Sequence, residues 1–156
     1  MIRVYIDFKY LNKACPNDNY ATPFIDLIIN ECAGNEIFSV MDSSSRYNQI
    51  NIHPEDQHKT AFIFPWGTFA YKKMPFGLKN VGATFQRAML YAFHKIKHII
   101  EAYLDDLGAH SRKRIDHPSH LRQVVEQCRY YKIWLKPNKC IFAITSSRLL
   151  GSCLQK

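Results

Sequence analysis

Hydrophobic and polar positions repeat along this chain with two different periods, and each period predicts a different kind of element. Apolar side chains that recur every three or four residues predict amphipathic helices, one opened by Thr22-Pro23 and closed by Gly34, one over residues 80–97 and one capped by Asp116. Alternation of apolar and polar residues predicts strands, over residues 2–7, 36–42 and 49–53.

Turn residues predict two hairpins in the same chain. The first joins residues 60–64 to 68–74, and the second carries Asp105 and Asp106 between two short apolar runs. Strands that neighbour strands, with helices between the groups, are typical of an α+β domain with a mainly antiparallel sheet. No linker divides the chain, so residues 1–156 are expected to form one such domain.

The adjacent carboxylates Asp105 and Asp106 leave two explanations open. Aspartate tolerates tight turns, so the pair fits a hairpin tip. Ionised neighbours repel each other, however, and a divalent cation would reverse that repulsion. A third carboxylate, Asp42, ends the predicted strand 36–42 and can meet the hairpin at the edge of the sheet, which favours a two-metal site. Asp42 and Asp105 would be its main ligands, and Asp106 a weaker one.

The overall composition is that of a folded, basic protein. Apolar residues make up 47% and charged residues 22%, and 21 Lys+Arg against 13 Asp+Glu give a net charge of +8. That excess permits a polyanionic partner such as nucleic acid. The five scattered cysteines form no CxxC pair and indicate reduced thiols inside a cell. No apolar run is long enough to predict a membrane span.

Five motifs follow one another in an order that is found in one family of enzymes. They are IDFKYLNKACPND, FSVMDSSSRYNQI, HKTAF with MPFGLKNVGATFQRAM, YLDDL, and LKPNKCIF with RLLG. A short xDD pattern by itself is common, whereas MPFGLKNVGATFQR is highly specific. Over nearly the whole chain, the motifs resemble the reverse transcriptase domain of gypsy-type LTR retrotransposons and, more distantly, retroviral reverse transcriptases.

The resemblance implies a polymerase palm, with a mainly antiparallel sheet, helices packed on one face, part of the fingers and no thumb. It implies an RNA-directed DNA polymerase that adds deoxynucleotides to a primer 3′ end with two Mg²⁺ ions, or Mn²⁺ as the alternative. The expected partners are an RNA or DNA template with its primer, deoxynucleoside triphosphates, and the thumb and ribonuclease H parts of a Pol polyprotein. Residues 1–156 would be a piece of that polyprotein truncated at both ends, in a cytoplasmic virus-like particle.

The resemblance also implies roles for individual residues by their position in the motifs. The residues expected in catalysis and metal binding are Asp42, Asp105 and Asp106, with Ser43 as a further metal ligand. Those expected at the incoming nucleotide are Arg3, Tyr47, Phe76 and Gly77, those expected at nucleic acid are Gln86 and Arg87, and Lys139 is expected to help neutralise pyrophosphate. Apart from the metal ligands, each keeps an ordinary structural alternative, as a surface charge, a core aromatic, a turn or a helix surface.

Two positions depart from the family pattern. Arg46 stands where a glycine usually precedes the aromatic residue, and Gly108 interrupts the branched apolar run that usually follows the aspartates. These departures support an alternative function, a catalytically impaired nucleic-acid-binding remnant of such an element. Another two-metal enzyme, such as a nuclease or cyclase, is disfavoured because MPFGLKNVGATFQR is typical of a templated nucleotide pocket.

Overall fold

The computed structural model describes residues 5–20, 23–43, 46–104, 106–145, 147–149 and 152–154. Its longer helices are α1 (Lys9–Ala14), α2 (Ile25–Cys32), α3 (Val81–Phe93) and α4 (His117–Tyr130). Short 3₁₀ helices form at η1 (Arg46–Gln49), η2 (Pro54–Thr60), η3 (His94–Ile96), η4 (Arg114–Asp116) and η5 (Pro137–Lys139). The strands are β1 (Ile37–Asp42), β2 (Phe62–Phe64), β3 (Gly67–Phe69), β4 (Ile100–Tyr103), β5 (Asp106–Ser111), β6 (Ile141–Ile144), β7 (Ser147–Leu149) and β8 (Ser152–Leu154).

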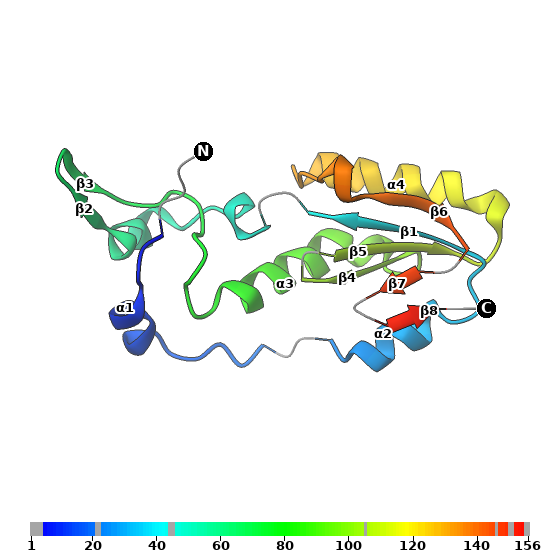
Figure 1. Cartoon of the computed structure of the whole chain (residues 1–156), viewed down its shortest axis with the longest axis horizontal. Helices are drawn as coiled ribbons and strands as arrows, with labels where there is room; N and C mark the ends of the chain where they lie inside the picture. Colours follow the sequence, from blue (N-terminus) through cyan, green and yellow to red (C-terminus); the bar gives the residue numbers. More distant parts are fainter. Residues whose placement is uncertain are drawn as a thin grey trace.

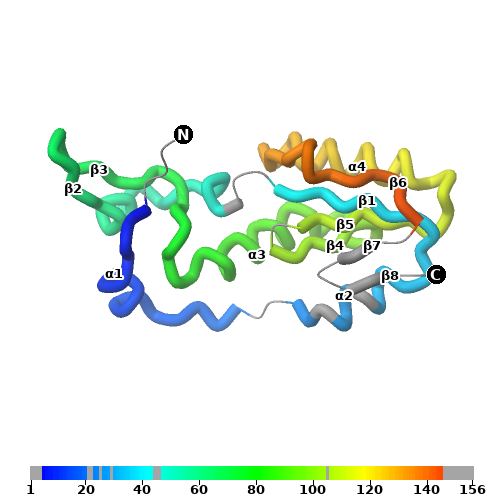
Figure 2. The backbone as a smooth tube through the Cα atoms, viewed as in Figure 1, coloured from blue at the N-terminus to red at the C-terminus, as the bar shows by residue number. Residues whose placement is uncertain are grey.

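A four-stranded antiparallel sheet forms the centre of the fold, with the strand order β4-β5-β1-β6. β1 and β5 are therefore the two inner strands, and β4 and β6 are the edges. In Figure 1, β1 points toward the half of the molecule that holds α1, β2 and β3. Its last residue, Asp42, pairs with Asp106, the first residue of β5, at that end of the sheet. The tube in Figure 2 shows α4 and the sheet together in the other half.

Alternation along β1 buries both faces of the sheet. On one face, Met41 is fully buried in the main core with Leu107 of β5, Phe85 of α3 and Val124 of α4. On the other face, Phe38 packs against α2 in a smaller cluster. The expected helices on one face are α3 and α4, and α2 additionally covers the second face. Within the described part of the chain, no helix is long and apolar enough to cross a membrane.

The predicted hairpin around the aspartates is present as β4 and β5. Tyr103 pairs with Asp106, so only two residues connect the strands. Leu104, the first of them, has a φ of 51°. Side chains with a Cβ rarely adopt this left-handed conformation, because the Cβ then crowds the backbone. The turn therefore needs support from the structure around it.

Three details of the sequence-based prediction are wrong. Residues 49–53 form no strand, because the chain winds into η1 and only Asn51 bridges to another segment, at Lys73. Residues 5–7, the described part of the predicted strand 2–7, are also outside any strand. Asp116 stands at the N-cap position of α4 but makes no capping hydrogen bond with its side chain. The expected capping residue Thr22 lies outside the described residues.

Candidate active site

The two inner strands bring two of the predicted metal ligands to one place. In the register of β1 and β5, Asp42 lies directly opposite Asp106, across the last pair of the ladder. Residues opposite each other in an antiparallel pair project to the same face of the sheet, with Cβ atoms about 4.5–5.5 Å apart. The sheet thus places both carboxylates on one face at the end of the inner strands.

Two lysines hold the carboxylate of Asp42. Lys136 Nζ lies 3.3 Å from Oδ1, and Lys139 Nζ lies 3.1 Å from Oδ2. They reach it because Lys136 donates its backbone N–H to the Asp42 carbonyl at 2.9 Å, and the neighbouring Leu135 bridges to Ser43. The turn η5 then brings Lys139 to the same side. Lys136 was not predicted at the site, although its spacing of three residues from Lys139 is a signal in the sequence.

The environment of Asp42 keeps it ionised. Burial raises the pKa of this carboxyl, but the ammonium groups of Lys139 and Lys136 outweigh burial and hold the pKa below its ordinary value of 3.8. The Asp42 side chain is only 14% exposed, whereas those of Lys136 and Lys139 are 36% and 61% exposed. A charged carboxylate whose cationic partners are more exposed than it is can exchange those partners for a metal ion.

Ser43, which follows Asp42, was also predicted to bind metal. Ser43 is fully buried, and its Oγ has no hydrogen-bond partner among the described residues. Successive side chains of a strand point to opposite faces, so Ser43 points toward the core face of Met41 and away from the carboxylate of Asp42. Its role as a metal ligand stays a prediction. The described residues contain no group of three histidine, cysteine or acidic side chains able to hold a metal, and Asp105 lies outside them.

Two residues predicted at the incoming nucleotide stack on each other. The rings of Tyr47 and Phe76 lie 6.3 Å apart at 26°, and Tyr47 also meets the buried ring of Phe85 edge-on at 5.5 Å. Phe76 is 64% exposed, so an aromatic face is open beside the core. The structure therefore brings Tyr47 together with Phe76, with one ring anchored in the core and the other exposed.

Gly77 follows Phe76 in a conformation that favours glycine, with a φ of 102°. Asn12 of α1 donates a hydrogen bond from Nδ2 to the Gly77 carbonyl at 2.7 Å, and its Oδ1 accepts one from the Lys79 N–H at 2.8 Å. One asparagine thus fixes the loop before α3 against the N-terminal part of the chain. The path of this loop therefore explains the glycine at position 77, whether or not the loop binds a ligand.

The two residues predicted to contact nucleic acid have other partners in the structure. Gln86 is fully buried, and its side-chain amide is bonded to the backbone of β4 and the following turn. Arg87 is exposed, but its guanidinium makes two hydrogen bonds to Asp18, of 3.0 and 2.8 Å, and lies 4.6 Å from the centre of the Tyr20 ring. The structure thus gives Gln86 a role inside the protein, which the polarity of its side chain did not predict.

Some predicted positions cannot be placed. Arg3 and Asp105 lie outside the described residues, and so does the side chain of Arg46. Their expected roles, in binding the triphosphate, in holding metal and in altering the nucleotide pocket, stay predictions. The site as described therefore consists of Asp42, Asp106 and the residues around them.

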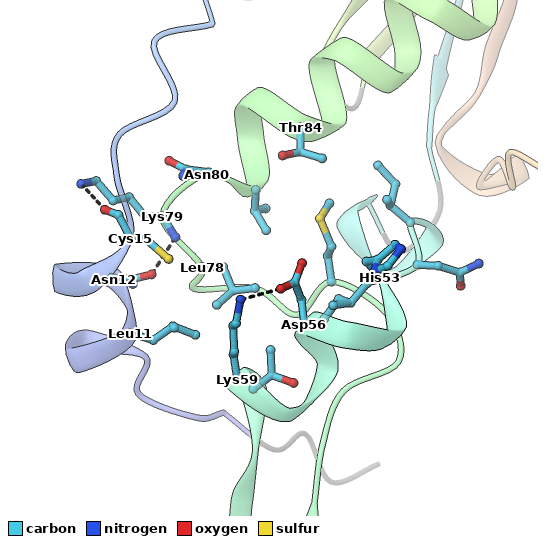
Figure 3. A pocket seen from close by; sticks show the side chains of 16 residues that line it. Leu11, Asn12, Cys15, His53, Asp56, Lys59, Leu78, Lys79, Asn80 and Thr84 are labelled. Carbon is cyan, nitrogen blue, oxygen red and sulfur yellow. Dashed lines mark hydrogen bonds and ion pairs between the residues drawn. The ribbon is translucent and has the colours of Figure 1, made fainter.

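A separate cavity of about 390 Å³ lies between α1, η2 and the start of α3 (Figure 3). Asp56 and Lys59 form an ion pair of 2.6 Å on its wall, and Asn12 and Lys79 are joined across it (Figure 3). Sequence reasoning did not predict this cavity, because its lining comes from segments far apart in the chain. Neither Asp42 nor Asp106 lines it.

The centre of the fold is thus an antiparallel sheet with facing aspartates on its inner strands and two helices packed on one face. The chain belongs to the reverse transcriptase (RNA-dependent DNA polymerase) family, whose sequence pattern matches residues 1–154. The family membership and the fold predicted from the motifs are thereby confirmed.

Relatives among curated proteins include polyproteins of transposons. The chain is 30% identical over 152 residues to the transposon Tf2-3 polyprotein and 29% identical to the transposon Tf2-7 polyprotein, both of Schizosaccharomyces pombe (strain 972 / ATCC 24843). Each match covers 96% of this chain and 11% of the polyprotein. The chain thus corresponds to a small part of these relatives.

Solved structures with the same fold include foamy viral proteins. The protease-reverse transcriptase in complex with an RNA/DNA hybrid matches with a TM-score of 0.85 and 19% identity, over 96% of this chain and 20% of that one. A form in complex with double-stranded DNA matches with a TM-score of 0.88 and 20% identity, over 98% of this chain and 27% of that one. At this level of identity the likeness concerns the fold.

Proposed function

We propose that this chain is the catalytic palm of an RNA-directed DNA polymerase within a retrotransposon polyprotein, and that it extends a primer 3′ end on an RNA or DNA template. The observation that carries the proposal is the pairing of Asp42 with Asp106 across the two inner strands. Supporting it are the family membership, and the foamy viral structures of the same fold that are bound to an RNA/DNA hybrid or to double-stranded DNA.

Divalent metal ions are the cofactors that reverse transcriptases generally use, and the residues here suit them. The donors are the oxygen atoms of the ionised carboxylate of Asp42 and of the facing Asp106. We propose that these residues, with Asp105, hold two Mg²⁺ ions, for which Mn²⁺ can substitute. When bound, such ions neutralise charge that develops on the transferred phosphoryl group and its leaving group.

The chain's own residues have three tasks in this reaction. Asp42 and Asp106 provide fixed negative charge at the end of the sheet. Tyr47 and Phe76 offer an aromatic surface to the incoming deoxynucleoside triphosphate, next to the core. Lys136 and Lys139 are within 3.3 Å of Asp42, so in the presence of substrate their ammonium groups can turn from the carboxylate to the phosphates. Catalysis of this kind depends on positioning and electrostatic stabilisation.

Single-nucleotide extension of a labelled primer on an RNA template tests the proposal. Extension should require Mg²⁺ or Mn²⁺ and fall at least about 100-fold in Asp42→Asn, because the substitution removes a charge and keeps the volume. Glu126→Gln, at an exposed position on α4, is the matched control. Template binding without extension in the wild type would support the alternative, a nucleic-acid-binding remnant that has lost catalysis.

A further inference from the structure

We propose that Gln86 is a positioning residue that fixes the turn between β4 and β5 and, through it, the carboxylates at the end of the sheet. The inference rests on the proposed function of that turn. Gln86 comes from α3, 16 residues before Ala102 and 18 before Leu104, the two positions to which its amide is bonded. It is one of the largest fully buried polar side chains in the described structure.

The contacts of Gln86 complete an edge of the sheet. β4 is an edge strand, so every second residue turns its N–H and C=O away from β5. Ile99, just before β4, and His110 of β5 form a hydrogen-bonded pair, because the His110 N–H donates to the Ile99 carbonyl at 3.0 Å. By alternation, Ala102 then directs its backbone groups outward, where Gln86 lies.

The Gln86 amide donates one hydrogen bond to the backbone and accepts another from it. Nε2 donates to the Ala102 carbonyl at 2.8 Å, and Oε1 accepts from the Leu104 N–H at 2.6 Å. These are the two contacts that a neighbouring strand would make along such an edge. If the amide were reversed, its oxygen would face the Ala102 carbonyl and its NH₂ group would face the Leu104 N–H. The two partners therefore fix the orientation of the side chain.

The second of these bonds acts on the strained part of the turn. Leu104 has a φ of 51°, a conformation that is costly for a residue with a Cβ. Its N–H, held by Gln86, lies one residue after Tyr103, which pairs with Asp106, and Asp106 in turn faces Asp42. A loosened Leu104 would therefore let the closing pair of the hairpin move relative to β1.

Full burial excludes a direct role for Gln86 at the template. Leucine or methionine would fill much the same space, so a residue needed only for packing would not have to be an amide. Buried polar groups remain in a core when their partners would otherwise be left without a hydrogen bond, and here the partners are backbone groups of the catalytic hairpin. Gln86 therefore acts on the site through the backbone.

The test compares Gln86→Met with Gln127→Met in this chain. Gln127 of α4 is a suitable control, because its Nε2 also donates to a backbone carbonyl, that of Ala92 at 2.7 Å, within a helix-packing region away from the hairpin. Two quantities are measured: the hydrogen-exchange rate of the Leu104 amide, and the affinity for Mn²⁺ alone, by the loss of free Mn²⁺ signal in electron paramagnetic resonance.

We expect Gln86→Met to speed exchange at Leu104 relative to the amides of Met89 and Val124, and to weaken Mn²⁺ binding by about tenfold, the usual effect of losing a residue that orients metal ligands. Gln127→Met should change both by less than about twofold. If Gln86→Met does not fold, Gln86→Glu replaces it, because a carboxylate can still accept from Leu104 but cannot donate to Ala102 unless it is protonated.

Unchanged Leu104 exchange and unchanged Mn²⁺ affinity in a folded Gln86 variant would overturn the inference. A wild-type chain that binds no Mn²⁺ would instead contradict the proposed function. In that event the exchange measurement, which needs no metal, still decides whether Gln86 holds the turn. Equal losses in the Gln86 and Gln127 variants would show general destabilisation and would also overturn the positioning role.

Discussion

Replacing Glu101 by glutamine should reduce the loss of unfolding free energy that the protein undergoes as the pH rises. Glu101 lies on β4, two residues before Tyr103. Burial, followed by a hydrogen bond to Glu31 and the negative charge of that residue, raises the pKa of Glu101 from 4.5 to about 8. A carboxyl with such a pKa holds a proton in the folded protein that it loses in the unfolded chain.

The sign of the effect follows from this difference in protonation. Because the folded state binds the proton more tightly, the stabilisation is complete below a pH of 4.5 and is lost as the pH rises toward about 8. Holding that proton at high pH costs about 1.4 kcal/mol for each pH unit between the two values. Between about pH 5 and pH 7.5 the wild type should therefore lose roughly 3 kcal/mol of unfolding free energy.

Urea unfolding at several pH values, followed by circular dichroism, measures this loss. Glu101→Gln keeps the volume and a hydrogen bond to Glu31, so its unfolding free energy should vary by at most about 1 kcal/mol over the same range. Glu126→Gln, at an exposed position on α4, should follow the wild type. Parallel curves for the wild type and Glu101→Gln would show that Glu101 is ionised in the folded protein and would refute the reasoning.

Four other substitutions have definite expected outcomes. Gly77→Ala should destabilise by about 1–3 kcal/mol in urea unfolding because of its φ of 102°, whereas Gly82→Ala in α3, where an added Cβ meets nothing within 4 Å, should stabilise by up to about 1 kcal/mol. Lys139→Met should strengthen binding of Mn²⁺ alone about two- to fivefold in calorimetry, because an exposed ammonium no longer competes for Asp42, and weaker binding would contradict this. Burial lowers the pKa of His110 from 6.5 to about 4, so stability should fall as the pH drops through this range, and His110→Gln should remove roughly 2–3 kcal/mol of that loss in acid unfolding curves.

Strong periodicity predicted much of the fold from the sequence. The apolar stripe that includes Phe85 and Met89 predicted α3, because the helix buries these side chains in the core, and alternation predicted β1, although both faces of that strand are covered. The same alternation over residues 49–53 predicted a strand that does not form. There, Ile50 packs against the core from beside a 3₁₀ helix, and an apolar pattern this short does not distinguish the two conformations.

The position of Asp42 in the candidate site was predictable, because the alternation pattern places this residue at the end of a strand. The partners of polar side chains were not predictable, because they come from distant segments. Gln86 has the sequence character of a surface residue, yet it is buried against β4. Arg87, next to it, pairs with Asp18, which lies 69 residues earlier. The partner of a polar side chain such as Gln86 depends on which backbone groups the tertiary packing leaves without a hydrogen bond.

The pairing of β1 with β5 also bears on how sequences of this kind can diverge. Asp42 and Asp106 face each other although the whole segment from Ser43 to Leu104, together with Asp105, separates them in the chain. Because ladder hydrogen bonds and buried alternation fix their alignment, insertions and replacements in the exposed loops of that segment leave it intact. A single-residue deletion inside β1 would instead turn one carboxylate to the opposite face. Mutational tolerance should therefore be lowest along a few residues of two strands and high across the loops and the β2–β3 hairpin between them.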